Sequence, residues 1–72
     1  MNKMKIKEMK EICDPLGITV ECKWSSGFQV SAKDEKTIKE GLRPLGFDVV
    51  GIGIGRDYNR NCVILYAERR SK

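Results

Sequence analysis

An eleven-residue segment of this chain occurs twice, 29 residues apart, and this repeat constrains the fold more than any other feature. The segment KEICDPLGITV, residues 10–20, returns as KEGLRPLGFDV, residues 39–49, with six of eleven positions identical. Each copy runs into Pro-Leu-Gly, which is typical of the end of a helix. A repeat of this kind indicates one supersecondary unit used twice. Convergence on the same helix-stop signals is the alternative explanation.

The first copy lies in a unit, residues 1–33, that reads as a helix followed by a β-hairpin. Apolar side chains recur every three or four residues up to Leu16, which predicts an amphipathic helix over residues 3–14. Apolar and polar residues then alternate over 18–24 and 28–32, which predicts two strands with one buried face. The alternation places Cys22 and Trp24 on the core side and leaves a polar outer face of Thr19, Glu21, Lys23, Gln29, Ser31 and Lys33.

The second copy predicts the same order of elements. Asp34 has the side chain of a helix N-cap, and an apolar stripe ending at Leu45 predicts the second helix. Two further strands are expected over residues 47–54 and 62–68, joined by a loop at residues 55–61.

These elements define an α+β protein with the order αββαββ in a single domain, residues 1–72. Unit one is residues 1–33 and unit two is residues 34–72, which ends in a basic tail. We expect a two-layer sandwich in which two helices lie on one face of a four-stranded, mostly antiparallel sheet. A circular permutation of the ferredoxin-like βαββαβ arrangement has the same element order, so the strand order stays open.

The chain is short, and its cysteines suggest no cross-linking framework. A chain of 72 residues buries only about 60% of its unfolded surface, so we expect oligomerisation to support the fold. Cys13, Cys22 and Cys62 have no CxxC spacing and there is no histidine, so no structural metal site is expected. Sparse cysteines, the lack of a signal-peptide core and the lack of a long apolar run predict a soluble cytoplasmic protein.

The sequence also contains no constellation of catalytic residues. Without histidine, neither a Ser-His nor a Cys-His pairing exists, so we expect no enzymatic activity and no cofactor. Gly51, Gly53 and Gly55 do not have the spacing of a dinucleotide-binding loop. We interpret these glycines as space for a large side chain, either Tyr66 or Phe47.

Gly41 takes the place of Ile12 when the two copies are aligned. Glycine inside a helix costs about 1 kcal/mol relative to alanine, so its presence calls for a packing reason. We expect Ile12 to pack onto Gly41 where the two helices meet.

The second hairpin differs from the first because both of its faces are apolar. Aligning the copies puts five apolar residues on its outer face: Val50, Ile52, Ile54, Val63 and Leu65. Exposed apolar patches usually mark interfaces, so these residues predict a homodimer or partner-protein surface. A slipped register, or a bulge at a glycine, would instead turn these side chains inward.

Basic and aromatic residues at the hairpin tips support DNA or RNA binding as an alternative function. Arginine contacts phosphates and aromatic rings stack on bases. The candidate contacts are Trp24, Lys23, Arg56, Tyr58, Arg60, Arg69 and Arg70. The net charge of +4 is divided equally between the two units, which permits such binding without requiring it.

Overall fold

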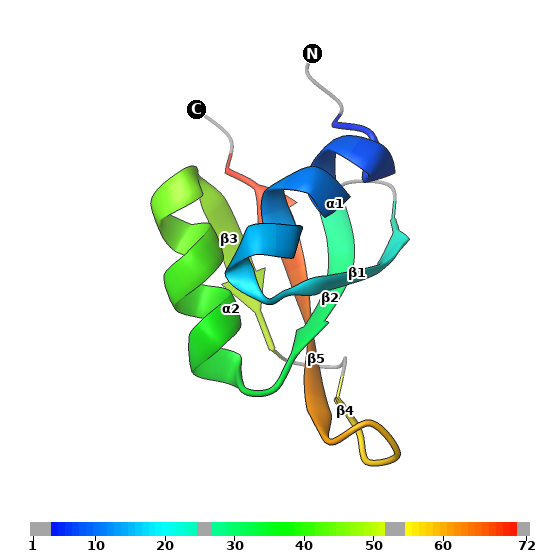
Figure 1. The fold of residues 1–72 in the computed structure, drawn as a ribbon. Helices are drawn as coiled ribbons and strands as arrows, with labels where there is room; N and C mark the ends of the chain where they lie inside the picture. Colours follow the sequence, from blue (N-terminus) through cyan, green and yellow to red (C-terminus); the bar gives the residue numbers. More distant parts are fainter. Residues whose placement is uncertain (1–3, 25–26, 52–54, 71–72) are drawn as a thin grey trace.

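In the part of the chain that the structure describes, there are two α-helices and an open, antiparallel, five-stranded sheet, which confirms the predicted α+β class. The computed structural model describes residues 4–24, 27–51 and 55–70. The elements are α1 (Ile6–Cys13), β1 (Thr19–Lys23), β2 (Gly27–Ala32), α2 (Glu35–Leu42), β3 (Phe47–Val50), β4 (Arg56–Asp57) and β5 (Cys62–Arg69), as Figure 1 shows. Short 3-10 helices, η1 (Asp14–Leu16) and η2 (Arg43–Leu45), follow the two α-helices. No helix within the described ranges is long and apolar enough to cross a membrane.

The helix ends follow the signals in the sequence. The Asp34 carboxylate caps α2 by accepting a hydrogen bond from the Thr37 backbone N–H at 2.8 Å. Each 3-10 helix carries a proline in its first turn and stops at a glycine in the left-handed region, Gly17 at φ 75° and Gly46 at φ 95°. The N-cap and both helix stops are therefore confirmed.

The strand order is β1-β2-β5-β3, with β4 also paired to β5, and every pairing is antiparallel. In the central pair, Val30 lies opposite Leu65. Along the other edge of β5, β3 pairs up to Val50 and the short β4 resumes the pairing at Arg56. The expected third strand over residues 47–54 is present as Phe47–Val50, and its residues 52–54 lie outside the described residues. The expected loop contains the two-residue strand β4.

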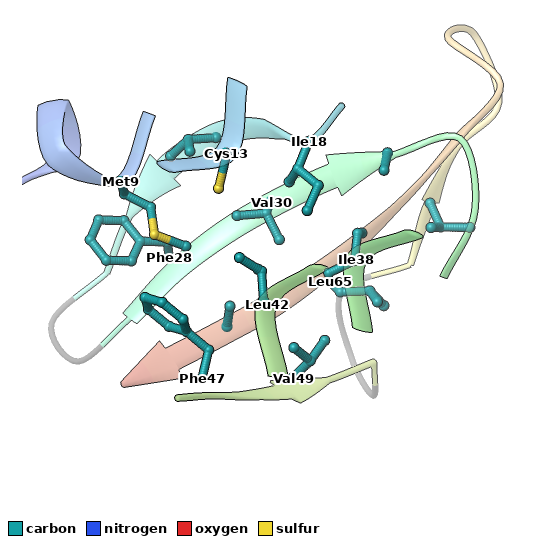
Figure 2. Close-up of a cluster of buried hydrophobic side chains, with 14 residues drawn as sticks. Met9, Cys13, Ile18, Phe28, Val30, Ile38, Leu42, Phe47, Val49 and Leu65 are labelled. Carbon is teal, nitrogen blue, oxygen red and sulfur yellow. The ribbon is translucent and has the colours of Figure 1, made fainter. Parts of the chain in front are cut away.

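One core cluster lies between the helices and a single face of the sheet (Figure 2). Met9 and Cys13 of α1 are fully buried, as are Ile38 and Leu42 of α2. The strands and their flanks contribute Ile18, Val20, Phe28, Val30, Ala32, Phe47, Val49, Val63, Leu65 and Ala67. Both helices therefore pack on the core side, and among the described residues no helix packs against the opposite side of the sheet, which we call the outer face. From the registers it carries Thr19, Glu21, Cys22, Gly27, Gln29, Ser31, Asp48, Val50, Ile64, Tyr66 and Glu68.

The expected outward orientation of Val63 and Leu65 is wrong. These side chains are only 8% and 5% exposed and belong to the core. The cause is the β2–β5 register, which places Val63 opposite Ala32 and Leu65 opposite Val30, on the face that the helices cover. The outer side of β5 instead presents its alternate residues, with Tyr66 at the centre.

A bulge in β1 reverses the predicted orientation of two further residues. The register shifts between Val20 and Cys22, so Cys22 lies opposite Gln29 on the outer face rather than in the core. Lys23 lies opposite Phe28, and its Nζ is 5.4 Å from the centre of the Phe28 ring. One extra residue in a strand exchanges the two faces beyond it, which explains both reversals.

Gly41 accommodates neighbours other than the predicted Ile12. A Cβ atom at Gly41 would lie 3.2 Å from Ile18 Cδ1 and 3.3 Å from Leu16 Cδ1. Helix α2 therefore packs closely against the segment that follows α1.

The space beside Gly51 is also filled by a different side chain from those predicted. A Cβ atom there would lie 3.0 Å from Leu65 Cδ2, so Leu65 approaches this backbone rather than Phe47 or Tyr66. Gly53 lies outside the described residues.

Candidate functional site

A continuous row of side chains crosses the outer face, with one residue from each of four neighbouring strands. The registers place Cys22 opposite Gln29, Gln29 opposite Tyr66, and Tyr66 opposite Val50. Directly opposed residues on one face have Cβ atoms about 4.5–5.5 Å apart, so adjacent members of the row are neighbours. Val50 is 43% exposed, although it is a large apolar side chain.

Trp24 extends this row at the β1–β2 turn. Its backbone N–H donates to the Gly27 carbonyl oxygen at 2.8 Å. Its indole Nε1–H donates to Gln29 Oε1 at 3.2 Å, and the Cys22 thiol lies 3.8 Å from the same oxygen. Trp24 is 52% exposed, so it does not fold onto the core, although strand alternation places it on the core side. Gln29 thus holds the indole toward the outer face.

The Tyr66 ring lies across strand β2 at Gly27. A Cβ atom at Gly27 would be 2.7 Å from Tyr66 Cζ and Oη, and 2.5 Å from the Ala67 carbonyl oxygen. Only a residue without a side chain leaves room for this ring. Trp24, Gln29, Tyr66 and Val50 therefore form one surface, which we call the aromatic row.

An arginine clamp closes the other end of the outer face. Arg60, in the β4–β5 turn, bonds Asp57 Oδ2 through Nε at 2.5 Å and Glu21 Oε2 through a terminal nitrogen at 2.8 Å. The buried Ser31 hydroxyl donates to the same Glu21 oxygen at 2.5 Å. The Arg60 hydrogen bond lowers the pKa of Asp57, helped by the Asn59 backbone N–H. The hydrogen bond to Asp57 is the main cause that raises the pKa of Arg60, and the hydrogen bond to Glu21 is the second.

The predicted nucleic-acid contacts do not converge on one surface. Lys23 and Trp24 lie near the carboxyl end of β5, whereas the turn that carries Tyr58 lies at its amino end (Figure 1). Through the registers, Lys23 is level with Ala67 and Asp57 with Cys62, so five residues of β5, at about 3.3 Å each, separate the two groups by about 17 Å. Tyr58 is 82% exposed at its turn.

Several of these predicted cations already have partners within the protein. Arg70 pairs with Asp48 at 3.0 Å and donates to the Phe47 carbonyl oxygen at 3.3 Å. The Arg69 guanidinium lies 5.7 Å from the centre of the Phe47 ring, on the core side. Arg56 is exposed and lies opposite Val63, also on the core side of the sheet.

The predicted apolar interface is only partly present on the outer face. Val50 lies there, Val63 and Leu65 are core residues, and Ile52 and Ile54 lie outside the described residues. Val50, Val63 and Leu65 do line one open groove of about 580 Å³, beside the break between β3 and β4. Its rim includes Glu35 and Lys39, which form an ion pair.

The cysteines carry free thiols, and their environments differ. Burial, followed by the charge of Asp14, raises the pKa of Cys13 to about 11, so this thiol stays protonated at neutral pH. Among residues 4–24, 27–51 and 55–70, no three Cys, Asp or Glu side chains are grouped as metal ligands would be.

Sequence reasoning missed Gln29, Gly27 and Tyr66 as members of the site. The sequence suggests Tyr66 only as a side chain beside the glycines of the third strand, and Gln29 only as one residue of a polar surface. Glu68 is a charged residue two positions after Tyr66, and alternate residues of a strand lie on the same face. This spacing is the signal in the sequence that the Tyr66 ring lies on the polar, outward side.

Comparisons with known proteins return no match for this chain: no family model, no curated protein and no solved structure.

Proposed function

We propose that this chain is a small, non-enzymatic binding protein whose outer sheet face docks another protein. The observation that carries the proposal is the aromatic row, which places an exposed Trp24 and Val50 beside Tyr66 on a face that neither helix covers. Tryptophan and tyrosine dominate the energetics of protein interfaces, since each combines a large apolar area with a polar group.

The face of the sheet is better suited to docking than its edges. The β1 edge carries a bulge between Val20 and Cys22, and the opposite edge is formed by two short strands, β3 of four residues and β4 of two. Bulges and short edge strands hinder the addition of a further strand from another chain. A partner therefore meets regular, uncovered structure only on the outer face.

A protein partner is favoured over nucleic acid because the cations of the outer face are already engaged. Arg60 is shared by Asp57 and Glu21, and Arg70 pairs with Asp48. Nucleic-acid binding draws its affinity from cations that are free to neutralise phosphates. The exposed Tyr58 near Arg56 is the remaining support for the alternative.

We also propose that the two halves of the fold are duplicated αββ units in a two-layer arrangement. The support is the pair of matching helix stops, at Gly17 and Gly46, and the central antiparallel pairing of β2 with β5. β4 is then a late addition to the second unit.

The homodimer expected from the sequence stays a proposal for the isolated protein. Its support is the small core of a 72-residue chain whose three cysteines are free thiols.

A photo-crosslinking residue in place of Val50 tests the docking function in an extract of the source cell. We expect protein adducts from this position, and their loss when Trp24→Ala is added. The same crosslinker in place of Glu40, on the exposed side of α2, is the matched control and should give no such adducts. Nucleic-acid adducts at Val50, or protein adducts whose yield is unchanged by Trp24→Ala, would contradict the proposal. An adduct of twice the monomer mass would identify a second copy.

A further inference from the structure

The charge of the outer face is opposite in sign to that of the whole chain. The strand registers and ion pairs place four carboxylates and two arginines here, with Asp57 on this face because it lies opposite Cys62: Glu21, Asp48, Asp57, Glu68, Arg60 and Arg70. These six groups sum to two excess negative charges, and the face stays negative even when Lys33, which directly follows β2, is counted with them, whereas the chain as a whole carries +4. The positive excess must lie elsewhere, so the docking face attracts cations and repels anions.

Glu68 is the carboxylate of this face that the described arginines leave unneutralised. Arg60 forms ion pairs with Glu21 and Asp57, and Arg70 forms an ion pair with Asp48. Glu68 lies directly opposite Asp48 across the β3–β5 ladder, and no described cation forms an ion pair with it. Like charges directly opposed across strands destabilise a sheet, so a cation at this position would be favourable.

Glu68 also adjoins the aromatic row. It lies opposite Gly27, the residue that the Tyr66 ring covers and whose carbonyl accepts the Trp24 backbone N–H. A carboxylate beside aromatic rings suits a lysine or arginine side chain, which gains from the negative charge and from the ring faces together.

We propose that the outer face binds a lysine- or arginine-bearing segment of a partner protein, with a cation at Glu68 and apolar contacts along the aromatic row. This inference rests on the proposed docking function and adds the chemistry of the partner. Two other occupants are disfavoured by charge. A nucleic acid would bring phosphates to an acidic face, and a second copy docked by the same face would bring its own carboxylates.

The chain contains one tryptophan, and it lies in this site, so its fluorescence reports occupancy directly. The probes are three: a capped hexapeptide of alternating arginine and leucine, the same peptide with glutamate in place of arginine, and single-stranded oligodeoxythymidine. We expect only the arginine peptide to shift or quench the Trp24 emission. Its affinity should fall as salt rises from about 50 to 500 mM, because screening weakens charge attraction.

Two charge-matched variants locate the cation. Glu68→Gln should raise the dissociation constant of the arginine peptide by about fivefold or more, because an interaction with a charged partner is lost. Glu40→Gln removes the same charge from the exposed surface of α2, where Glu40 faces Lys36, and should leave the affinity unchanged. Circular dichroism of both variants confirms that each is folded.

Several results would overturn the partner chemistry. They are equal responses to the two peptides, a response to the oligonucleotide, no response to the arginine peptide, or an unchanged affinity in Glu68→Gln. A Trp24 response to rising concentration of the protein alone would identify a second copy as the occupant, and would also overturn it. The docking function itself stands or falls separately, with the crosslinks from Val50.

Discussion

At the scale of single residues, the space around Gly41 decides what a methyl group does there. Alanine gains about 1 kcal/mol of helix propensity over glycine, but its Cβ would crowd the ends of Leu16 and Ile18. We expect Gly41→Ala to change the free energy of unfolding by less than about 0.5 kcal/mol, since the two effects oppose each other. When Leu16→Ala removes one of the crowding side chains, Gly41→Ala should stabilise the protein by most of the difference in helix propensity. Urea denaturation of the four proteins measures this, and a full gain in the wild-type background would contradict the close contact.

Two residues predicted to share one patch should differ strongly in how much stability their truncation removes. Leu65 is buried, so Leu65→Ala should lower the free energy of unfolding by about 2–5 kcal/mol. Val50 is exposed, so Val50→Ala should change it by less than about 0.5 kcal/mol. Chemical denaturation compares them directly. Similar losses at both positions would mean that Val50 is also a core residue.

At the scale of elements, the β4–β5 hairpin should weaken in acid. The Arg60 hydrogen bond lowers the pKa of Asp57 in the folded protein, so the unfolded chain takes up this proton first. The stabilisation is present above the ordinary aspartate range and is lost as pH falls below about 4 toward the lowered value. Asp57→Asn should therefore flatten the fall of the thermal midpoint between about pH 4 and pH 2.5.

Arg60→Gln separates this clamp from general acid denaturation. It keeps the Asp57 carboxyl but removes the partner that lowers its pKa, so it should flatten the same part of the pH profile. An unchanged acid slope in both variants would show that the clamp does not contribute.

The elements whose ends carry specific side chains were predictable from sequence. Asp34 supplies a cap that no neighbouring residue duplicates, and Gly17 and Gly46 supply the left-handed conformation at both helix ends. β3 was also assigned to the correct faces over its observed length. Asp48 breaks its apolar pattern and fixes which side is polar.

The faces of β1 and β5 could not be predicted in the same way. In β5, apolar residues occupy both phases from Cys62 to Ala67, so neither face is marked by polarity and only the pairing with β2 decides. In β1, Cys22 and Trp24 continue the alternation begun at Ile18, and nothing in that pattern signals a bulge. The aromatic row depends on both features, which is why it became visible only in three dimensions.

At the scale of the whole molecule, the sign of the salt dependence distinguishes the modes of association. A homodimer joined through two acidic outer faces should tighten as salt rises, because screening weakens the repulsion between carboxylates. Binding of a cationic segment should weaken over the same range. Sedimentation velocity at low and high salt measures the first. A dimer that dissociates in high salt would have to use a different surface.

The helix stops have one consequence that concerns chirality. Gly17 and Gly46 have φ angles of 75° and 95°, and a Cβ atom of L configuration built on either meets no atom within 4 Å beyond its chain neighbours, so only backbone strain opposes an L side chain there. D-alanine prefers this region of backbone space and would lower the entropy of the unfolded chain, so each replacement should stabilise the protein by about 0.4–1 kcal/mol. L-alanine at the same positions should destabilise it. Thermal unfolding of chemically synthesised proteins would compare the two enantiomers, which differ only in the handedness of one carbon atom.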